Sequence, residues 1–149
     1  MTDLILAIFH HLLVFALLAV LTYELAMVRI GMTAKDIAKV SRVDAAYGIL
    51  AALILIVGFL RVFYGAKGPA FYLENPVFWA KIIAFLVVGV LSIWPTLRLI
   101  AWRNRIAREP AHLPSPAEIK NVRLFMHLEG TVFILIPIFA AMMARGYGL

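Results

Sequence analysis

Two long apolar runs of the chain meet at a short charged and aromatic segment, Arg61-Val-Phe-Tyr-Gly-Ala-Lys-Gly-Pro-Ala-Phe-Tyr-Leu-Glu-Asn-Pro-Val-Phe-Trp-Ala-Lys81. The segment begins with one cation, Arg61, and ends with another, Lys81. Both lie within the apolar runs and not in the polar turn that joins them. A charge at the centre of a bilayer costs about 3 kcal/mol on insertion scales, so intramembrane cations are expected to serve a function. The segment therefore predicts a hairpin between two membrane helices, with a polar site beneath it.

The composition places the chain in the membrane class. Hydrophobic residues make up 64% of its 149 residues, charged residues make up 15%, and the mean hydropathy is +0.98, far more apolar than a water-soluble domain of this size requires. Cysteine is absent, which excludes disulfides, iron–sulfur clusters and thiolate metal sites. The net charge of +6 comes from cations between apolar runs, so we expect a lipid bilayer as the partner and no nucleic acid.

Four apolar runs predict four membrane-spanning helices, at about residues 4–28, 34–64, 76–102 and 116–144. Each has about 20 apolar residues or more, enough to cross a hydrocarbon core of about 30 Å at 1.5 Å per residue. Three starts carry their own signals, which are capping boxes at Thr33 and Ser115 and the pair Asn75-Pro76. We therefore predict an all-α fold, an integral membrane four-helix bundle with up-down topology, and a single domain over residues 1–149.

The positive charges predict the orientation in the membrane. Ten of the fourteen Lys and Arg residues lie in or beside the first and third connections, and such residues concentrate on the cytoplasmic side. Both termini and the hairpin segment (residues 61–81) then lie outside. We expect a multi-pass protein of a bacterial inner membrane, with its N-terminus and C-terminus outside.

Three polar residues from three helices fall at a similar depth below the outer surface. At 1.5 Å per residue, His10 lies about 9 Å down the first helix, Lys81 about 7 Å down the third, and Arg61 about 5 Å below the end of the second. In a four-helix bundle they can converge, with Tyr64 and Trp79 of the hairpin segment beside them. The alternative is that the two cations extend to the lipid headgroups and that the aromatic residues form an ordinary interfacial belt.

A second polar group is predicted near the cytoplasmic side, and its main members are Glu24, Arg98, His127 and Glu129, with Asp44 and Tyr47 of the second helix in the same set. Glu24 lies about 40° from His10 around the first helix, so we expect both to face the interior of the bundle. His127 and Glu129 lie about 200° apart, so only one of them can face the same site. The alternative is that Glu24 and Arg98 form an ion pair that only fixes the order of the helices.

His10 is the hardest of these residues to explain by a structural role alone. A histidine in a membrane helix suits an axial haem ligand, a proton acceptor or a metal ligand. Zinc or copper would require further ligands at the same depth, and the sequence offers only His11 and two methionines there. A haem held by both His10 and His127 is excluded, because the two lie roughly 15 Å apart along the membrane normal.

Two short motifs resemble a known superfamily. Phe9-His10 in the first helix and Phe78-Trp79-Ala80-Lys81 at the start of the third resemble the small membrane proteins that include HemJ-type protoporphyrinogen oxidases and CopD-like proteins. The resemblance implies that His10 and Lys81 form a catalytic pair and that haem b, with its iron on His10, is the cofactor. HemJ-type sequences have His-x-Lys in the third helix and Asn-Glu in the last, whereas this chain has Trp79-Ala80-Lys81 and Leu128-Glu129.

A wider pattern is similar to an uncharacterised family of predicted four-helix bacterial membrane proteins, and it brings no assigned activity. The pattern comprises His10-His11, Tyr23-Glu24, residues 61–81, Trp94-Pro95-Thr96 and Trp102-Arg103.

Two functions from different classes follow. In the first, the protein binds haem b or a porphyrin for redox chemistry: His10 supplies the axial or proton-accepting nitrogen, Arg61 and Lys81 pair with the propionates, and Tyr64 and Trp79 cover the ring. In the second, it is a non-enzymatic carrier or accessory subunit for an ion, a metal or a small anionic solute, and so narrow a bundle favours a homo-oligomer for transport. A third interpretation gives the polar groups a purely structural role. Whether the chain is an enzyme stays open at this stage.

Overall fold

The computed structural model describes residues 1–148, which form helices and connecting turns without any β-strand. Three of the helices are long and uninterrupted: α1 (Thr2–Met27), α2 (Ala34–Tyr64) and α4 (Pro76–Arg108). A short helix, α3 (Gly68–Leu73), lies between α2 and α4 in the chain. The last long segment is divided into α5 (Pro116–Phe133) and α6 (Leu135–Ala144).

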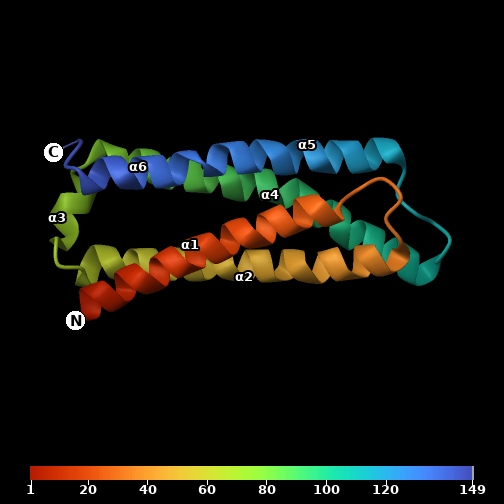
Figure 1. Cartoon of the computed structure of the whole chain (residues 1–149), viewed down its shortest axis with the longest axis horizontal. Coiled ribbons are helices and arrows are strands. Elements are labelled where there is room, and N and C mark those ends of the chain that lie inside the picture. Colours follow the sequence, from red (N-terminus) through yellow and green to blue (C-terminus); the bar gives the residue numbers. More distant parts are fainter. Residues whose placement is uncertain (149) are drawn as a thin grey trace.

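The long helices run up and down beside one another, and α3 lies across one end of the bundle (Figure 1). α1 packs against α2, α4 packs against α5 and α6, and α2 and α4 join the two groups. The start of α1 and the end of α6 lie at the end that carries α3, which we call the terminal end (Figure 1). The α1–α2 and α4–α5 connections lie at the opposite, basic end (Figure 1). The predicted all-α four-helix bundle is confirmed.

The outer surface of the bundle is suited to lipid. Four segments are long and apolar enough to cross a membrane: Thr2–Met27, Ala34–Tyr64, Pro76–Arg108 and Pro116–Ala144. Large apolar side chains cover the outside, and Phe15, for example, is 66% exposed. Such a continuous apolar surface would drive aggregation in water, so a bilayer is its natural solvent. Between the helices lies a core of fully buried residues that includes Leu17, Val40 and Leu99.

The helices differ from their sequence-based ranges in three places. α4 continues to Arg108 instead of ending near residue 102, α3 forms within the hairpin segment, and the last segment breaks at Ile134. The break is explained by Pro137, because a proline lacks the N–H that would bond to the carbonyl four residues earlier and its ring clashes with that carbonyl. Pro95 has the same chemistry inside α4, but α4 remains one helix.

Capping boxes begin α2 and α5, as predicted. The Thr33 hydroxyl accepts a hydrogen bond from the Asp36 backbone N–H at 3.2 Å, and the Asp36 carboxylate accepts from the Thr33 N–H at 2.9 Å. Ser115 and Glu118 form the same pair of bonds at the start of α5. Each box satisfies two N–H groups that a helix start otherwise leaves without partners, so both helices begin before their apolar stretch.

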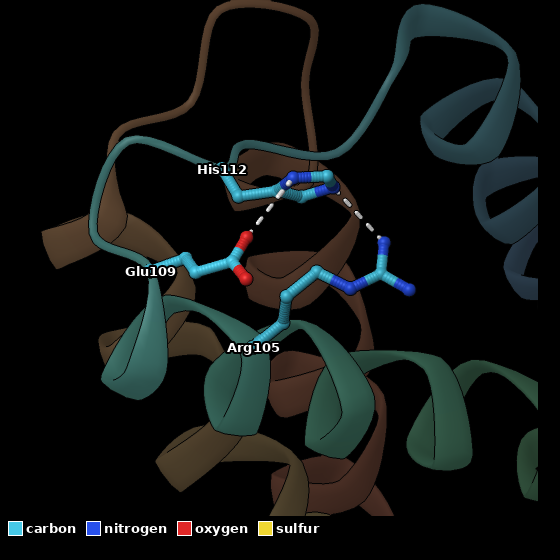
Figure 2. A network of polar contacts seen from close by, with 3 residues as sticks. All are labelled: Arg105, Glu109 and His112. Atoms are coloured by element: carbon cyan, nitrogen blue, oxygen red, sulfur yellow. Dashed lines mark hydrogen bonds and ion pairs between the residues drawn. The ribbon is translucent and has the colours of Figure 1, made fainter.

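The α4–α5 connection at the basic end is held by contacts of His112. Figure 2 shows its ring between Arg105 and Glu109: Arg105 Nη1 lies 3.1 Å from His112 Nε2, and His112 Nδ1 lies 3.7 Å from Glu109 Oε2. Because a guanidinium can only donate, Nε2 accepts, and the ring hydrogen on Nδ1 faces the carboxylate. All three side chains are exposed, so these contacts order the connection and do not belong to the bundle interior.

Candidate functional site

A cavity beneath the terminal end, the terminal cavity, receives side chains from all six helices. Its polar lining consists of His10 from α1, Arg61 from α2 and Lys81 from α4, with Tyr72 of α3 beside them. The rest of the wall is apolar and includes Phe78, Phe85 and Phe133. The structure thus brings together the three residues that depth arithmetic placed at one level.

The nitrogen atoms of this cavity have no acidic partner. None of its lining residues is Asp or Glu. His10 Nδ1 and Arg61 Nε are buried and form no hydrogen bond with any described residue. Lys81 Nζ lies 5.2 Å from the centre of the Phe78 ring, a weak cation–π contact. Buried polar groups are normally hydrogen-bonded, so this site has unused capacity to bind an acceptor.

The imidazole of His10 lies against α2 at a glycine. A Cβ added to Gly58 would lie 3.4 Å from His10 Cε1, so a larger side chain there would press on the ring. The neighbouring His11 is exposed, and its Nδ1 donates to the Ala7 carbonyl at 2.6 Å. Of the two adjacent histidines, only His10 faces the cavity.

The terminal cavity is small, about 80 Å³, which is room for a few water molecules. Its wall also includes Leu55 and Phe59, which are 37% and 57% exposed on the outside of the bundle. The cavity therefore borders the lipid-facing surface, and the apolar body of a larger ligand would extend through this side.

Two aromatic residues expected at the site lie outside it. Tyr64 is 68% exposed, and Trp79 is 48% exposed with its Nε1 donating to the Leu73 carbonyl at 2.9 Å. Their positions are taken by Tyr72 and Phe78, both buried and packed edge to face with ring centres 5.7 Å apart. Sequence reasoning missed this exchange because the hairpin segment was treated as a loop, whereas α3 turns Tyr72 inward.

The end of the chain covers the hairpin segment beside the cavity. Asn75 is fully buried, its side-chain oxygen accepts from the Val77 N–H at 2.8 Å, and its Nδ2 donates to the Tyr147 carbonyl at 3.1 Å. One side chain therefore caps α4 and holds the residues that follow α6. This cap fixes the start of α4, and so the register of Lys81.

The second polar group differs from the expected set. Glu24 and Glu129 are buried, but Arg98 and His127 are exposed on the outside of the bundle. Arg98 lies over the Trp94 ring, 5.1 Å from its centre, and no ion pair joins Arg98 to Glu24 among the described residues. Helix geometry was right that His127 and Glu129 face different ways, and it is Glu129 that faces inward.

Two residues of α2 complete this inner group. The Tyr47 hydroxyl donates to Glu129 Oε1, and the Thr96 hydroxyl donates to Asp44 Oδ1 at 2.8 Å. Asp44 and Tyr47 are three residues apart, one helical turn, and both are buried. Their depth along the second helix had placed both residues in this group.

Comparison with known proteins gives a match to a family model. The family model described as "Predicted membrane protein (DUF2214)" matches residues 2–148. No curated protein matches the chain, and no solved structure does. The match spans nearly the whole chain, including the four membrane-spanning segments. The chain therefore belongs to the DUF2214 family of predicted membrane proteins.

Proposed function

We propose that the terminal cavity binds an apolar molecule with an acidic group, specifically haem b or a porphyrin, and that the protein takes part in redox chemistry with it. The observation that carries the proposal is the lining: His10, Arg61 and Lys81 meet in an apolar cavity that contains no carboxylate. Two cations without counter-ions inside a membrane bundle are costly. An anionic ligand would supply the missing charge.

The chemistry of the residues suits the acidic edge of a tetrapyrrole. Arg61 and Lys81 would bind its propionates, since hydrogen bonds between ionised partners are stronger than neutral ones. The cavity volume of about 80 Å³ is smaller than a whole tetrapyrrole, so part of the ring would extend past Leu55 and Phe59 of the cavity wall. His10 would serve as axial ligand or proton acceptor, and a bound haem would supply one-electron transfer.

The resemblance to HemJ-type and CopD-like proteins supports the pairing of His10 with Lys81. Both residues line the same cavity from different helices. Tyr64 and Trp79 would not cover the ring, because both side chains are exposed and neither lines the cavity; Tyr72 and Phe78 would take this role. We also propose that the terminal end faces the outside of a bacterial inner membrane, as the positive charges of the basic end favour.

The test is the absorption spectrum of the protein purified from haem-replete cells, followed by titration with haem and with a metal-free porphyrin. We expect a Soret band or saturable porphyrin binding, lost in His10→Ala and weakened in Lys81→Met. His11→Ala is the matched control, because His11 is exposed, and it should bind as the wild-type protein does. A protein that binds neither ligand, or a His10→Ala variant that binds both unchanged, overturns the proposal.

A second function is favoured by another hollow in the bundle. This second cavity, between α1, α2 and α4, is lined by Asp44, Tyr47, Thr96 and Arg103, and Phe85 borders both cavities. Two cavities that share Phe85 in their walls suit a carrier for a small anionic solute, in which Phe85 would act as a barrier. Solute flux into vesicles that rises in Phe85→Ala would support a carrier. Equal flux in empty vesicles and in vesicles with either protein would refute it.

A further inference from the structure

The buried carboxyl groups of the inner group have no role in the terminal cavity. Glu24 of α1, Asp44 of α2 and Glu129 of α5 are 3%, 7% and 2% exposed, and they occur inside membrane-spanning segments. Tyr47 of α2 bonds to Glu129, and Thr96 of α4 bonds to Asp44. Four helices thus contribute to one polar cluster, the carboxyl cluster, defined by Glu24, Asp44, Tyr47, Thr96 and Glu129.

No cation compensates the carboxyl cluster. Within residues 1–148 the one acid–base contact within 4 Å is His112–Glu109, at the exposed α4–α5 connection. Arg123 of α5 is directed to the end of α1, where its Nη1 donates to the carbonyls of Leu25 and Val28 at 2.7 and 2.5 Å. An isolated buried carboxylate costs several kcal/mol, so three of them require a positive charge from elsewhere.

Two buried oxygen atoms near the carboxyl cluster lack hydrogen-bond partners. Glu24 Oε1 and Ser41 Oγ are buried and form no hydrogen bond with any residue that the structure describes. Both residues are 3% exposed. A native bundle rarely leaves such groups without water, a proton or an ion to complete them.

The second cavity leads to this cluster. Ser41, Asp44 and Tyr47 line it, and so do Ile100 and Arg103, which are exposed on the basic half of the bundle. Its volume of about 360 Å³ has room for on the order of ten water molecules. Water in this cavity would connect the cluster to the solution at the basic end.

We propose that the carboxyl cluster is a proton-binding site, loaded from the second cavity. A hydronium ion in the cavity gives its proton to a carboxylate oxygen of the cluster and leaves a neutral water behind. Tyr47 and Thr96 hold two of the carboxyl groups by donating to them, while Glu24 has an oxygen free to take a proton. A metal ion is the poorer occupant, because no three His, Cys, Asp or Glu side chains among the described residues are placed to hold one.

The charged groups around the cluster set its dependence on pH. They are Glu24 from α1, Asp44 and Tyr47 from α2, Arg103 at the cavity wall from α4, and Glu129 with Arg123 from α5. The carboxyl groups hold protons at low pH and release them in successive steps as the pH rises, since ionisation of one carboxyl group opposes ionisation of its neighbours.

Infrared spectroscopy of the wild-type protein in lipid vesicles tests the proposal directly. We expect a protonated-carboxyl C=O band at neutral pH that shifts in D₂O and disappears as the pH is raised. Glu24→Gln and Glu129→Gln each lose part of the band, and glutamine keeps the shape of a neutral glutamic acid, so both variants should fold. Glu109→Gln, in the exposed connection, is the control and keeps the whole band.

Three results would overturn the proposal: no such band at neutral pH, a band that neither cluster variant changes, or a band abolished by Na⁺ or Ca²⁺ at constant pH. The pH titration of the wild-type protein stands even if a variant fails to fold. The test is also independent of the terminal cavity, because His10→Ala should keep the band whether or not a porphyrin binds.

Discussion

Replacing Lys81 with methionine separates a ligand-binding role from a structural one. Lys81 shares the terminal cavity with Arg61 and His10, and no acidic residue lines that cavity. If Lys81 is there for a ligand, the protein without ligand should become more stable when the charge is removed. If it is there for structure, the same change should destabilise the bundle.

The size of the effect follows from its position. Lys81 lies five residues after Pro76, about 7.5 Å along α4. A charge at this depth costs less than at the centre of the bilayer, where the cost is about 3 kcal/mol. Replacing a buried ion pair by apolar residues of similar volume is neutral or stabilises by about 1–4 kcal/mol, and we expect a single partly buried cation such as Lys81 to lie in the lower part of this range. Loss of the Phe78 contact opposes this by about 0.5–1 kcal/mol. We expect the free energy of unfolding to rise by about 1 kcal/mol.

The assay is reversible unfolding in mixed micelles with increasing denaturing detergent, for wild type and Lys81→Met. Lys120→Met, at an exposed position of α5, is the control and should unfold as wild type does. Porphyrin binding should weaken by about tenfold or more in Lys81→Met, because a hydrogen bond between ionised groups is worth about 1.5–3 kcal/mol. A variant that is less stable and binds porphyrin normally would refute the reasoning.

Three other changes have defined outcomes. Gly58→Leu fills the space beside the His10 ring and should abolish porphyrin binding, while Ala52→Leu, on the exposed side of α2, should bind normally; equal binding by both contradicts the geometry. Tyr47→Phe leaves Glu129 without its donor and should lower the free energy of unfolding by about 1–3 kcal/mol, which detergent titration measures; an unchanged midpoint contradicts it. Asn75→Ala removes the buried cap of α4 and should destabilise by about 1 kcal/mol, seen as a lower melting temperature; an unchanged one counts against the cap.

The helices and the convergence at the terminal cavity could be predicted because both depend on simple distances. A fixed rise of 1.5 Å per residue placed His10, Arg61 and Lys81 at one level, and the bundle has only one interior for them to share. The capping boxes at Thr33 and Ser115 were predictable for a similar reason, since both partners lie within four residues of sequence.

The aromatic lining could not be predicted in the same way. Its composition depends on α3, a six-residue helix too short for a periodic signal, which turns Tyr72 inward and leaves Tyr64 outside. Pro137 explains the break at Ile134, but a proline in the sequence does not by itself predict a break. Pro95 has the same chemistry, and α4 remains one helix. Tertiary contacts decide between these outcomes.

The inner group shows how rotation about a helix limits sequence reasoning. The angle between His127 and Glu129 was predictable, but the sequence could not say which of the two faces the core. The neighbours of Glu129 decide it: Met126 and Phe133 are buried on the same face. Arg98 was expected beside Glu24, yet its side chain is exposed and lies over the Trp94 ring, where the charge avoids the cost of burial.

The central claim is that Arg61 and Lys81 recognise the acidic groups of an apolar ligand in the terminal cavity. The most direct measurement compares the affinity of the purified protein for a porphyrin dicarboxylate and for its uncharged diester. We predict that the diester binds about tenfold more weakly or worse to wild type, and that the difference vanishes in Arg61→Met/Lys81→Met. Equal binding of acid and diester to wild type, or no binding of either, would contradict the claim.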